Sequence, residues 1–371
     1  MLVAKICLTG GPCGGKSTAL SKIEQTLTDK GYKVFIIDEI ATRYINAGIK
    51  PFGEDAISIV DFEEILLKSQ ILEEESFTKT ANLLNKKCII LCDRGIFDIK
   101  SFLTNRQFNS LLKKYNLSKL NLMDSYNLVL NLNTVAKGKE KFYTTENNKA
   151  RREGIKDAIL RDDRCEDAWS FHQNLRIIDN STNFEEKINR VINEINNYLG
   201  LEKKYEKKYL VELNDVFDGF VNSKDLVRVK IKQTYLYTDK DCEVRLRQRV
   251  IEDDINYYVT VKKNNYGNQT IITDNIITKE EYERLLSSNI VINTVEKERI
   301  CFVYEDSFYK LDIFEDRICI LETNEKEKIP NFVSVIKDVT NEDKFYNINI
   351  GKNKNSNILK KCIKGVIIWF I

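Results

Sequence analysis

The stretch that decides the fold of the first half of the chain is residues 2–18, which read LVAKICLTGGPCGGKST. An apolar run over residues 2–8 leads into a glycine-rich turn, and residues 18–27 then have the spacing of a helix. Between Gly10 and Ser17 the turn fits the pattern G-x-x-x-x-G-K-[ST], in the strand-then-helix setting that this pattern requires. We therefore predict a phosphate-binding loop here, rather than a plain glycine turn between a strand and a helix.

The residue types of this loop explain how it would hold a polyphosphate. Glycines allow successive backbone N–H groups to turn inward around the phosphates, Lys16 neutralises the outer phosphates, and the Ser17 hydroxyl can ligate Mg²⁺. The N-terminal end of the following helix carries a partial positive charge that faces the same anion. The predicted nucleotide contacts are Gly10, Gly11, Pro12, Cys13, Gly14, Gly15, Lys16, Ser17 and Thr18.

Length and composition limit the classes to which the protein can belong. Its 371 residues are enough for two domains with separate cores. Lys and Arg number 58 against 56 Asp and Glu, and the net charge of +2 gives no overall field for nucleic acid or a membrane surface. Nine cysteines without a C-x-x-C pair, and one histidine, favour reduced thiols over a zinc site or disulfides. The first strand begins at the start of the chain, so we expect no signal peptide and a cytoplasmic location.

A second apolar run, residues 33–37, ends in Asp38 and Glu39. Open α/β sheets bind ligands in the crevice beyond the carboxyl ends of their strands. Glu39 is therefore a candidate catalytic base or substrate contact. The alternative is that this acidic pair only starts the next helix, with Asp38 as its cap.

A third apolar run, residues 88–92, is followed directly by Asp93 and Arg94. An acidic residue after a hydrophobic strand is the Walker B arrangement, in which the carboxylate holds Mg²⁺ or its water opposite the serine of the loop. We predict that Ser17 and Asp93 serve the metal, that Asp93 takes part in catalysis, and that Arg94 pairs with a phosphate. A solvated turn is the alternative.

The strands and helices expected between these motifs and residue 200 complete an α/β domain over residues 1–200. Arginines, among them Arg151, gather in the charged stretch 138–164. In phosphoryl-transfer enzymes such arginines lie on a mobile lid and stabilise charge on the phosphates, so Arg151 is a candidate catalytic residue. The alternative is a solvated helix face. Further strands are expected at residues 126–132 and 175–180, and helices at residues 57–84 and 184–199.

Several short motifs in this half resemble a known family. They are Lys141-Phe142-Tyr143-Thr144-Thr145-Glu146-Asn147-Asn148, Ala150-Arg151, Glu153-Gly154, Ala168-Trp169, His172 and Ile178-Asp179-Asn180-Ser181. With the loop, they resemble the AAA-like P-loop ATP/GTPase domain of the NadR and TRPL translocation defect type, over residues 1–199. The resemblance implies that Lys16 and Ser17 bind GTP or ATP with Mg²⁺ and that Asp93 serves the metal. Glu39 matches the acidic strand end of that family.

Beyond residue 201 helical periodicity gives way to alternation, which predicts a second domain over residues 201–350 and a tail over residues 351–371. Helices are expected only at residues 279–288 and 332–337. Antiparallel strands in this number close well as a barrel, so the expected fold is an α/β P-loop domain followed by an α+β antiparallel barrel. The expected strands are residues 205–214, 226–237, 243–251, 257–263, 269–275, 300–305, 308–314 and 317–321.

Alternation also places basic residues on one face of several of these strands. If the faces converge inside a barrel, they form a cationic tunnel, and such buried charge needs an anion or carboxylates to offset it. Alternatively these side chains point to water. The residues are Arg245, Arg247 and Arg249, which share a face with Glu243, and Lys230, Lys232, Lys262, Lys297 and Arg299 on other strands.

The order of motifs in this half resembles the CYTH, or triphosphate tunnel, family over residues 203–350. The motifs are Glu206-Lys207-Lys208-Tyr209-Leu210-Val211, Gln233-Thr234-Tyr235-Leu236, Glu243-Val244-Arg245-Leu246-Arg247, Tyr258-Val259-Thr260-Val261-Lys262, Glu296-Lys297-Glu298-Arg299 and Leu311-Asp312-Ile313-Phe314. That family hydrolyses triphosphates or binds phosphorylated ligands, using basic residues for phosphate and carboxylates for metal. The resemblance implies phosphate contacts at Lys208, Arg245, Arg247, Lys262, Lys297 and Arg299, and metal carboxylates at Glu206 and Glu322.

The sequence departs from that family at two metal positions. Lys204 stands where the first metal carboxylate is usual, and Glu322-Thr323-Asn324 keeps one acidic residue where a pair is usual. A two-metal site needs several oxygen ligands, so we expect anion binding without turnover.

The pairing of these two domains resembles the TRPL translocation defect protein family. It implies a Mg²⁺-dependent GTP- or ATP-binding regulator whose barrel binds a phosphorylated ligand, such as polyphosphate or an acidic phospholipid headgroup at a membrane. A small-molecule kinase and a barrel triphosphatase are the alternatives. The apolar end at residues 366–371 is too short to span a bilayer and is either a membrane-touching tail, a buried strand or a misread gene end.

Overall fold

The computed structural model describes residues 3–143, 154–201, 206–224, 226–239, 241–265, 269–315, 318–324 and 328–352. The chain divides into two compact units. The first comprises Met1–Tyr198 and Cys301–Phe308, and the second comprises Leu199–Ile300 and Tyr309–Ile371. The predictions for Arg151, Lys204 and the apolar end at residues 366–371 fall outside the described residues.

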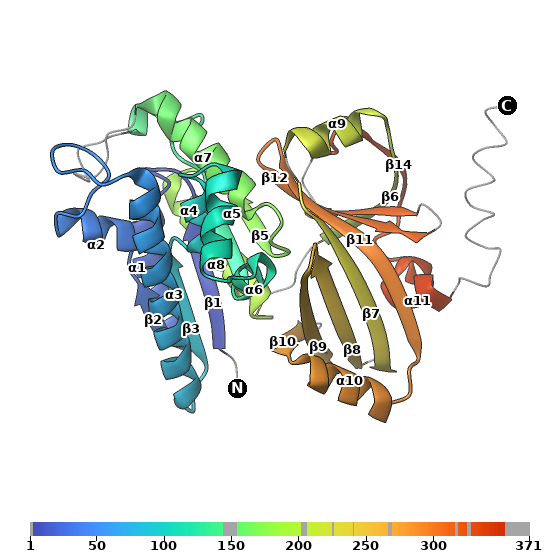
Figure 1. Cartoon of the computed structure of the whole chain (residues 1–371). Helices are drawn as coiled ribbons and strands as arrows, with labels where there is room; N and C mark the ends of the chain where they lie inside the picture. The colour runs from blue at the N-terminus through green and yellow to red at the C-terminus, as the bar shows by residue number, and fades with distance from the viewer. Residues whose placement is uncertain are drawn as a thin grey trace. The chain divides into compact units, whose positions relative to one another are not determined.

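The first unit is a parallel five-stranded sheet covered by helices on both faces (Figure 1). Its strand order is β2-β3-β1-β4-β5. The strands are β1 (Val3–Thr9), β2 (Lys33–Ile37), β3 (Cys88–Asp93), β4 (Leu128–Leu132) and β5 (Leu175–Ile178). The helices are α1 (Lys16–Asp29), α2 (Ile40–Asn46), α3 (Ile59–Leu83), α4 (Ile96–Lys100), α5 (Asn105–Lys114), α6 (Lys119–Asp124), α7 (Ile155–Trp169) and α8 (Phe184–Tyr198), with a 3₁₀ turn η1 (Glu140–Phe142).

The strands of this sheet are apolar along their length because both faces are covered. Helices α1 and α8 pack on one face, and α3, α4 and α7 pack on the other. Every residue of β3 and β4 is buried. Strand β1 lies between β3 and β4, where the strand order changes direction, and such a switch point is where open α/β sheets bind ligands.

The predicted α/β architecture of the first half is confirmed, with additional short helices. Helices α2, α4, α5 and α6 were not predicted from apolar spacing, because all four are only five to ten residues long. Caps start two of them. Thr104 and Gln107 form a capping box for α5, and the Ser118 hydroxyl accepts a hydrogen bond at the start of α6.

The second unit is an antiparallel sheet of nine strands in the order β10-β9-β8-β7-β11-β12-β13-β6-β14. The predicted antiparallel architecture is thereby confirmed, whereas closure of this sheet into a barrel stays a prediction. The strands are β6 (Glu206–Leu213), β7 (Arg228–Thr238), β8 (Cys242–Ile251), β9 (Asp254–Asn265), β10 (Gln269–Ile277), β11 (Asn293–Tyr304), β12 (Ser307–Phe314), β13 (Cys319–Asn324) and β14 (Val333–Asp338). The helices are α9 (Val216–Ser223), α10 (Lys279–Ser288) and α11 (Asn347–Lys352), with a 3₁₀ turn η3 (Asp343–Phe345).

The prediction of helices only at residues 279–288 and 332–337 was wrong in part. Residues 279–288 form α10, but most of the second segment forms strand β14, which pairs with β6 through a bulge between Val335 and Lys337. Val333, Val335 and Ile336 are β-branched and suit a strand, and pairing with β6 decides the outcome. Helices α9 and α11 form where no helix was predicted.

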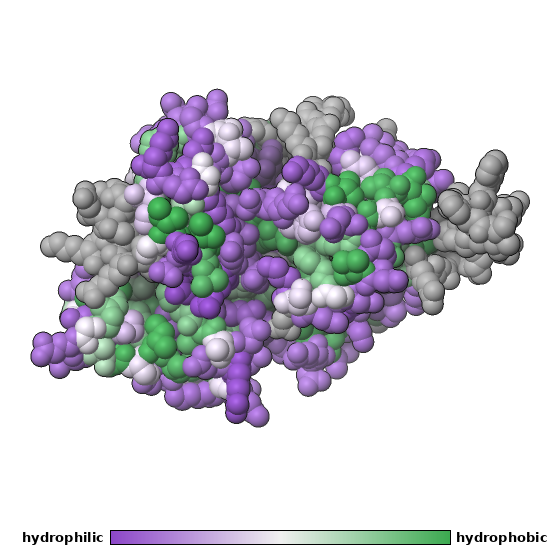
Figure 2. Space-filling model, turned by 90° about the horizontal axis from the view of Figure 1, so that it is seen from above, coloured by the Kyte–Doolittle hydropathy of each residue, from purple (hydrophilic) through white to green (hydrophobic). Residues whose placement is uncertain are grey.

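The surface is mostly polar on the face that Figure 2 shows, where apolar residues form separate patches. Among the helices of the described residues, none is long and apolar enough to cross a bilayer.

A buried carboxylate on α3 ties this helix to the sheet of the first unit. Glu74 is 2% exposed and accepts hydrogen bonds from Lys5 Nζ at 2.6 Å, from Gln70 Nε2 at 2.7 Å and from the Tyr126 hydroxyl. The Tyr126 hydroxyl in turn accepts the Ile96 N–H at 2.8 Å. One carboxyl group thus joins β1, α3, α4 and the segment before β4.

We predict that Glu74→Ala destabilises the first unit by about 3–5 kcal/mol, because it leaves the Lys5 ammonium buried without its counter-charge. Urea unfolding followed by the fluorescence of Trp169, which is fully buried in this unit, measures the change. The control is Glu75→Ala at the exposed neighbouring position, with an expected change within about 0.5 kcal/mol. Equal stability of the two variants would contradict the prediction.

Candidate functional site

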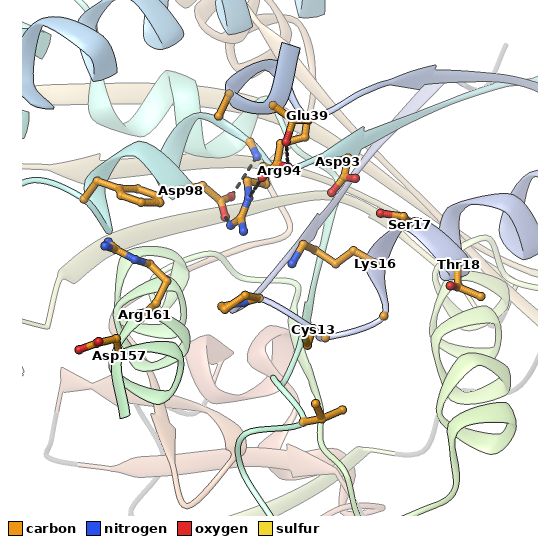
Figure 3. Close-up of a pocket in the computed structure, with 18 of the residues that line it drawn as sticks. Cys13, Lys16, Ser17, Thr18, Glu39, Asp93, Arg94, Asp98, Asp157 and Arg161 are labelled. Atoms are coloured by element: carbon orange, nitrogen blue, oxygen red, sulfur yellow. Dashed lines mark hydrogen bonds and ion pairs between the residues drawn. The ribbon is translucent and has the colours of Figure 1, made fainter. Parts of the chain in front are cut away.

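A cavity of about 1150 Å³ opens beside the P-loop of the first unit (Figure 3). This exceeds the roughly 300–1000 Å³ typical of small-molecule pockets. One part is lined by the loop and the segment before α8, and the other by α2, α3, α4 and α7. Of the predicted nucleotide contacts, Gly10 and Gly11 are not among the lining residues of this cavity, and the rest line it: Pro12, Cys13, Gly14, Gly15, Lys16, Ser17 and Thr18.

Close backbone packing explains the glycines of the loop. A Cβ atom at Gly10, whose φ is +116°, would lie 2.4 Å from the Leu132 carbonyl oxygen, and a Cβ at Gly14 would be as close to the same oxygen. Gly15, with φ +91°, precedes α1, and no side chain caps this helix. The backbone N–H groups of its first turn are therefore left for another acceptor, as an anion site at a helix N-terminus requires.

Lys16 folds back over the loop. Its Nζ donates to the carbonyl oxygens of Gly10 at 3.0 Å and Gly11 at 2.8 Å. Burial lowers the pKa of Lys16, and the neighbouring Arg94 lowers it further. The ammonium is thus held at the loop by two neutral acceptors, and a phosphate would offer it a stronger, charged partner.

Asp162 on α7 fixes the loop from behind. Its Oδ1 accepts the N–H of Gly11 at 2.6 Å and the N–H of Thr134 at 3.2 Å, and its Oδ2 pairs with Lys137 Nζ at 2.9 Å. A Cβ at Gly11 would lie 2.9 Å from that of Asp162. We did not single out Asp162 from the sequence. Its signal is its spacing on the buried stripe of α7, with Ala158, Cys165 and Trp169.

Arg94 joins the ends of β2 and β3. Its Nε pairs with Glu39 Oε1 at 2.5 Å and its Nη1 with Asp98 Oδ1 at 2.9 Å (Figure 3). Burial alone would raise the pKa of Glu39, but Arg94 and the Thr42 hydroxyl lower it to about 2. Glu39 is therefore ionised near neutral pH and weakly basic. In this structure Glu39 orients Arg94. Glu39, not Asp38, is the N-cap residue directly before α2.

Asp98 holds this arrangement in place and was missed from the sequence. It is 3% exposed and accepts hydrogen bonds from Thr9 Oγ1 at 2.6 Å, Gly95 N at 3.0 Å and Trp169 Nε1 at 3.1 Å, besides Arg94. The only local signal is its place three residues after Gly95 in the first turn of α4, where it completes a cap.

Asp93 is 8% exposed, and its Oδ1 has no hydrogen-bond partner among the described residues. Burial raises the pKa of Asp93 to about 6, against the opposing effect of Lys16. In Figure 3 the carboxyl group of Asp93 and the hydroxyl of Ser17 face one another. The described residues contain no group of three or more His, Cys, Asp or Glu that could hold a metal. An orphaned carboxylate oxygen beside a hydroxyl suits Mg²⁺, which usually keeps water and phosphate oxygens as its other ligands.

The part of the cavity away from the loop is largely apolar. Arg161 on α7 reaches it, with Nη1 donating to the Ser101 carbonyl oxygen at 2.5 Å and its guanidinium 3.7 Å from the centre of the Phe102 ring. Of the predicted lid, only this arginine is described at the cavity, since Arg164 is exposed and Arg151 lies outside the described residues. The apolar side chains are those of Phe52, Ile59, Phe62, Leu66, Ile99 and Phe102.

In the second unit, the structure gathers several of the predicted phosphate contacts around two carboxylates. Asp312 pairs with Lys297 at 2.5 Å and with Arg299 at 2.6 Å. Glu322 pairs with Lys208 at 3.0 Å and lies 3.6 Å from Arg299. Burial lowers the pKa of Lys297 to about 7, although Asp312 acts in the opposite direction.

The other predicted contacts lie on β8 and β9. Arg245 pairs with Glu243 at 3.1 Å, Arg247 pairs with Asp274, and Lys262 is half-buried opposite Glu243.

Lys310 on β12, which we did not single out from the sequence, lies 3.2 Å from Glu206 and 3.5 Å from Glu322. Both predicted metal carboxylates are therefore already in contact with cations of the protein itself.

Lys230 and Lys232 do not join this cluster, and for these two residues the alternative holds, in which the side chains point to water. Both are exposed on β7, and Lys232 pairs with Glu296 of β11 at 3.0 Å. Every second residue of β7 from Val229 to Gln233 is buried, so the lysines between them face solvent.

Of the comparisons with known proteins, the family model concerns the first unit. A family model described as AAA domain matches residues 5–187. No curated protein matches the chain. Among solved structures, NadR protein in complex with NAD and AMP-PNP is 13% identical, with 55% of this chain and 51% of that chain covered and a TM-score of 0.38.

Two further structures are PH1819 protein from Pyrococcus horikoshii OT3 and the conserved hypothetical protein Pfu-838710-001 from Pyrococcus furiosus. They are 21% and 15% identical, cover 33% and 34% of this chain and 80% of their own chains, and have TM-scores of 0.25 and 0.26. The match of residues 5–187, together with the loop geometry, supports an AAA-like P-loop domain in the first half of the chain.

Proposed function

We propose that the first unit binds a nucleoside triphosphate with Mg²⁺ and transfers its terminal phosphoryl group to a small-molecule acceptor in the same cavity. The observation that carries this proposal is the extent of the cavity, which continues from the P-loop into an apolar chamber under α3 and α4. A nucleotide-responsive regulator needs only the part at the loop. A kinase needs a second compartment for the acceptor.

Some residues of the site bind the phosphates or the metal ion, and others hold these residues in position. Lys16 and the first turn of α1 bind the phosphates, and Ser17 and Asp93 hold Mg²⁺, which neutralises charge on the phosphates when bound. Arg94, fixed by Glu39 and Asp98, and Arg161 on the opposite wall flank the space between the loop and the chamber (Figure 3). NadR was crystallised with AMP-PNP, and the same class of ligand suits this loop.

We predict that Lys16→Ala weakens binding of AMP-PNP with Mg²⁺ at least about tenfold, because it removes the charge-assisted contact to the outer phosphates. Isothermal titration calorimetry measures the affinity. Lys22→Ala, at an exposed position on the same helix, is the matched control and should bind like the wild type. Equal affinity of the Lys16 and Lys22 variants would rule out nucleotide binding at this loop.

The kinase proposal is tested by release of ADP from ATP in the presence of a panel of nucleosides and hydroxylated metabolites. We expect release that depends on one class of acceptor in wild type and in Lys22→Ala, and that is lost in Lys16→Ala. If ADP is released at the same slow rate whether or not an acceptor is present, the result would instead favour a nucleotide-responsive regulator that hydrolyses ATP.

We predict that the contribution of Asp93 to binding is lost in acid. Burial holds the pKa of Asp93 at about 6, above the usual value, so its carboxyl group takes up a proton as the pH falls below 6. The protonated group has no negative charge with which to bind Mg²⁺, and its contribution to the affinity is lost. The affinity for AMP-PNP with Mg²⁺, taken as the ratio of wild type to Asp93→Asn, should fall by up to about tenfold between pH 7.5 and pH 5. The nucleotide's own titration cancels in this ratio, and a ratio that does not change with pH would contradict the assignment.

We propose, second, that the basic cluster of the second unit binds a phosphorylated ligand. This rests on Lys297, Arg299 and Lys208 lying around two carboxylates, and on the half-buried Lys262, for which the described residues show no ion pair. The shared chemistry is a polyanion, whether free polyphosphate or the headgroup of an acidic phospholipid.

We predict that Lys262→Ala weakens binding of tripolyphosphate by about 3–10-fold, whereas Lys263→Ala, at the exposed neighbouring position, does not. Calorimetry with tripolyphosphate and flotation with vesicles that contain a phosphoinositide distinguish the two sources of the anion. Binding of neither by the wild type, or equal loss in both variants, would refute a specific site.

A further inference from the structure

One face of α3 forms a wall of the apolar chamber. Ile59, Phe62, Glu63, Leu66 and Gln70 line the cavity and follow one another at helical spacing. Ile59, Phe62 and Leu66 are apolar, as expected for a cavity wall. Gln70 is polar, but its side chain donates a hydrogen bond to Glu74. Glu63 is the exception, because it is a carboxyl group placed between Phe62 and Leu66 on an apolar stripe.

Glu63 is 2% exposed, yet no hydrogen bond or ion pair reaches its carboxyl group from the residues that the structure describes. Apart from Asp93 at the proposed metal site, three other buried carboxyl groups of this unit differ from Glu63. Glu74 has Lys5 and Tyr126, Asp98 has Arg94 and Trp169, and Asp162 has two backbone N–H groups. A buried polar group without a partner costs stability, so its retention points to a partner that is not part of the chain.

The surroundings of Glu63 define the chemistry of that partner. Burial raises the pKa of Glu63 to about 8, although Arg161 and Arg94 act in the opposite direction. Near neutral pH the group is therefore mostly an uncharged carboxyl, with one O–H donor and one carbonyl acceptor. Phe52, Phe62 and Phe102 line the same chamber and offer apolar, aromatic contact.

We propose that the α3 face around Glu63 is the acceptor subsite, and that Glu63 selects an uncharged, hydroxyl-bearing small molecule with an apolar or aromatic part. This inference rests on the proposed phosphoryl transfer. Glu63 binds a hydroxyl of the acceptor through its donor and its acceptor atom, and the aromatic side chains enclose the remainder. The uncharged carboxyl offers no counter-charge to a cation or an anion, so Glu63 favours an uncharged, hydroxyl-bearing part of the acceptor.

The first test is the stability of Glu63→Leu without any ligand. The change removes an unpartnered buried carboxyl and retains volume, so we expect the melting temperature to rise by about 3–6 °C. The matched control is Glu64→Leu, one position along the helix, where the carboxyl pairs with Lys114 and Tyr115 and its loss should lower the melting temperature or leave it unchanged. A lower melting temperature for Glu63→Leu than for wild type would show a structural role and overturn the proposal.

The second test measures ligand selection by thermal shift on protein loaded with AMP-PNP and Mg²⁺. The probes are adenosine and uridine, which are uncharged and hydroxyl-bearing with a flat ring, and their 5′-monophosphates as charged counterparts. We expect stabilisation by a nucleoside in wild type and in Glu63→Gln, whose amide keeps a donor and an acceptor, and at least a tenfold weaker effect in Glu63→Leu. AMP-PNP should bind all three proteins equally.

Stronger stabilisation by the monophosphates, an unchanged nucleoside effect in Glu63→Leu, or no stabilisation of the wild type by any of the four probes would each refute the subsite. Failure of wild type to bind AMP-PNP would instead refute the proposed function of the whole cavity.

Discussion

The constraint on which this structure depends is that a charge removed from water needs a partner inside the protein. Arg94 shows it most clearly. Arg94 follows β3 in the left-handed backbone region, with φ +71°, and its partly buried guanidinium lies between Glu39 and Asp98. Asp98 in turn collects N–H and O–H donors from β1, α4 and α7. The strand ends, the loop and the helices around the cavity are therefore positioned by one set of paired charges.

Against this background, the groups that lack such partners mark where a ligand belongs. Asp93 keeps a buried oxygen without a hydrogen bond, Lys16 has only carbonyl oxygens, and Glu63 has no hydrogen bond or ion pair within the described residues. All three line the same cavity. A folded chain that gives hydrogen bonds to both oxygens of Glu74 and of Asp98 has no structural reason to leave these groups incomplete. Their incompleteness is explained if a metal, a phosphate and an acceptor complete them in turn.

The sequence predicted what short-range patterns encode. The P-loop and the carboxylates at the ends of β2 and β3 follow from apolar runs and their terminal residues, and the parallel sheet follows from the same runs. Asp98 and Asp162 were missed because their roles come from hydrogen bonds across 60 or more residues of chain, as between Gly11 and Asp162. Glu63 was missed because the cavity that it lines is built from segments far apart in the sequence. Residues 333–338 were misassigned for a related reason, since pairing with β6, more than 100 residues earlier, decides that they form a strand.

The same constraint has the opposite consequence in the second unit. There most of the clustered cations have carboxylate partners: Asp312 pairs with Lys297 and Arg299, and Glu322 pairs with Lys208 and lies near Lys310. An anion must compete with these carboxylates, so only a ligand with several charged oxygens gains enough to bind. A metal ion at Glu206 and Glu322 would lie beside Lys310, and its charge would be repelled by the ammonium that already neutralises both carboxylates. The second unit is thus better suited to holding a polyanion than to hydrolysing it with metal.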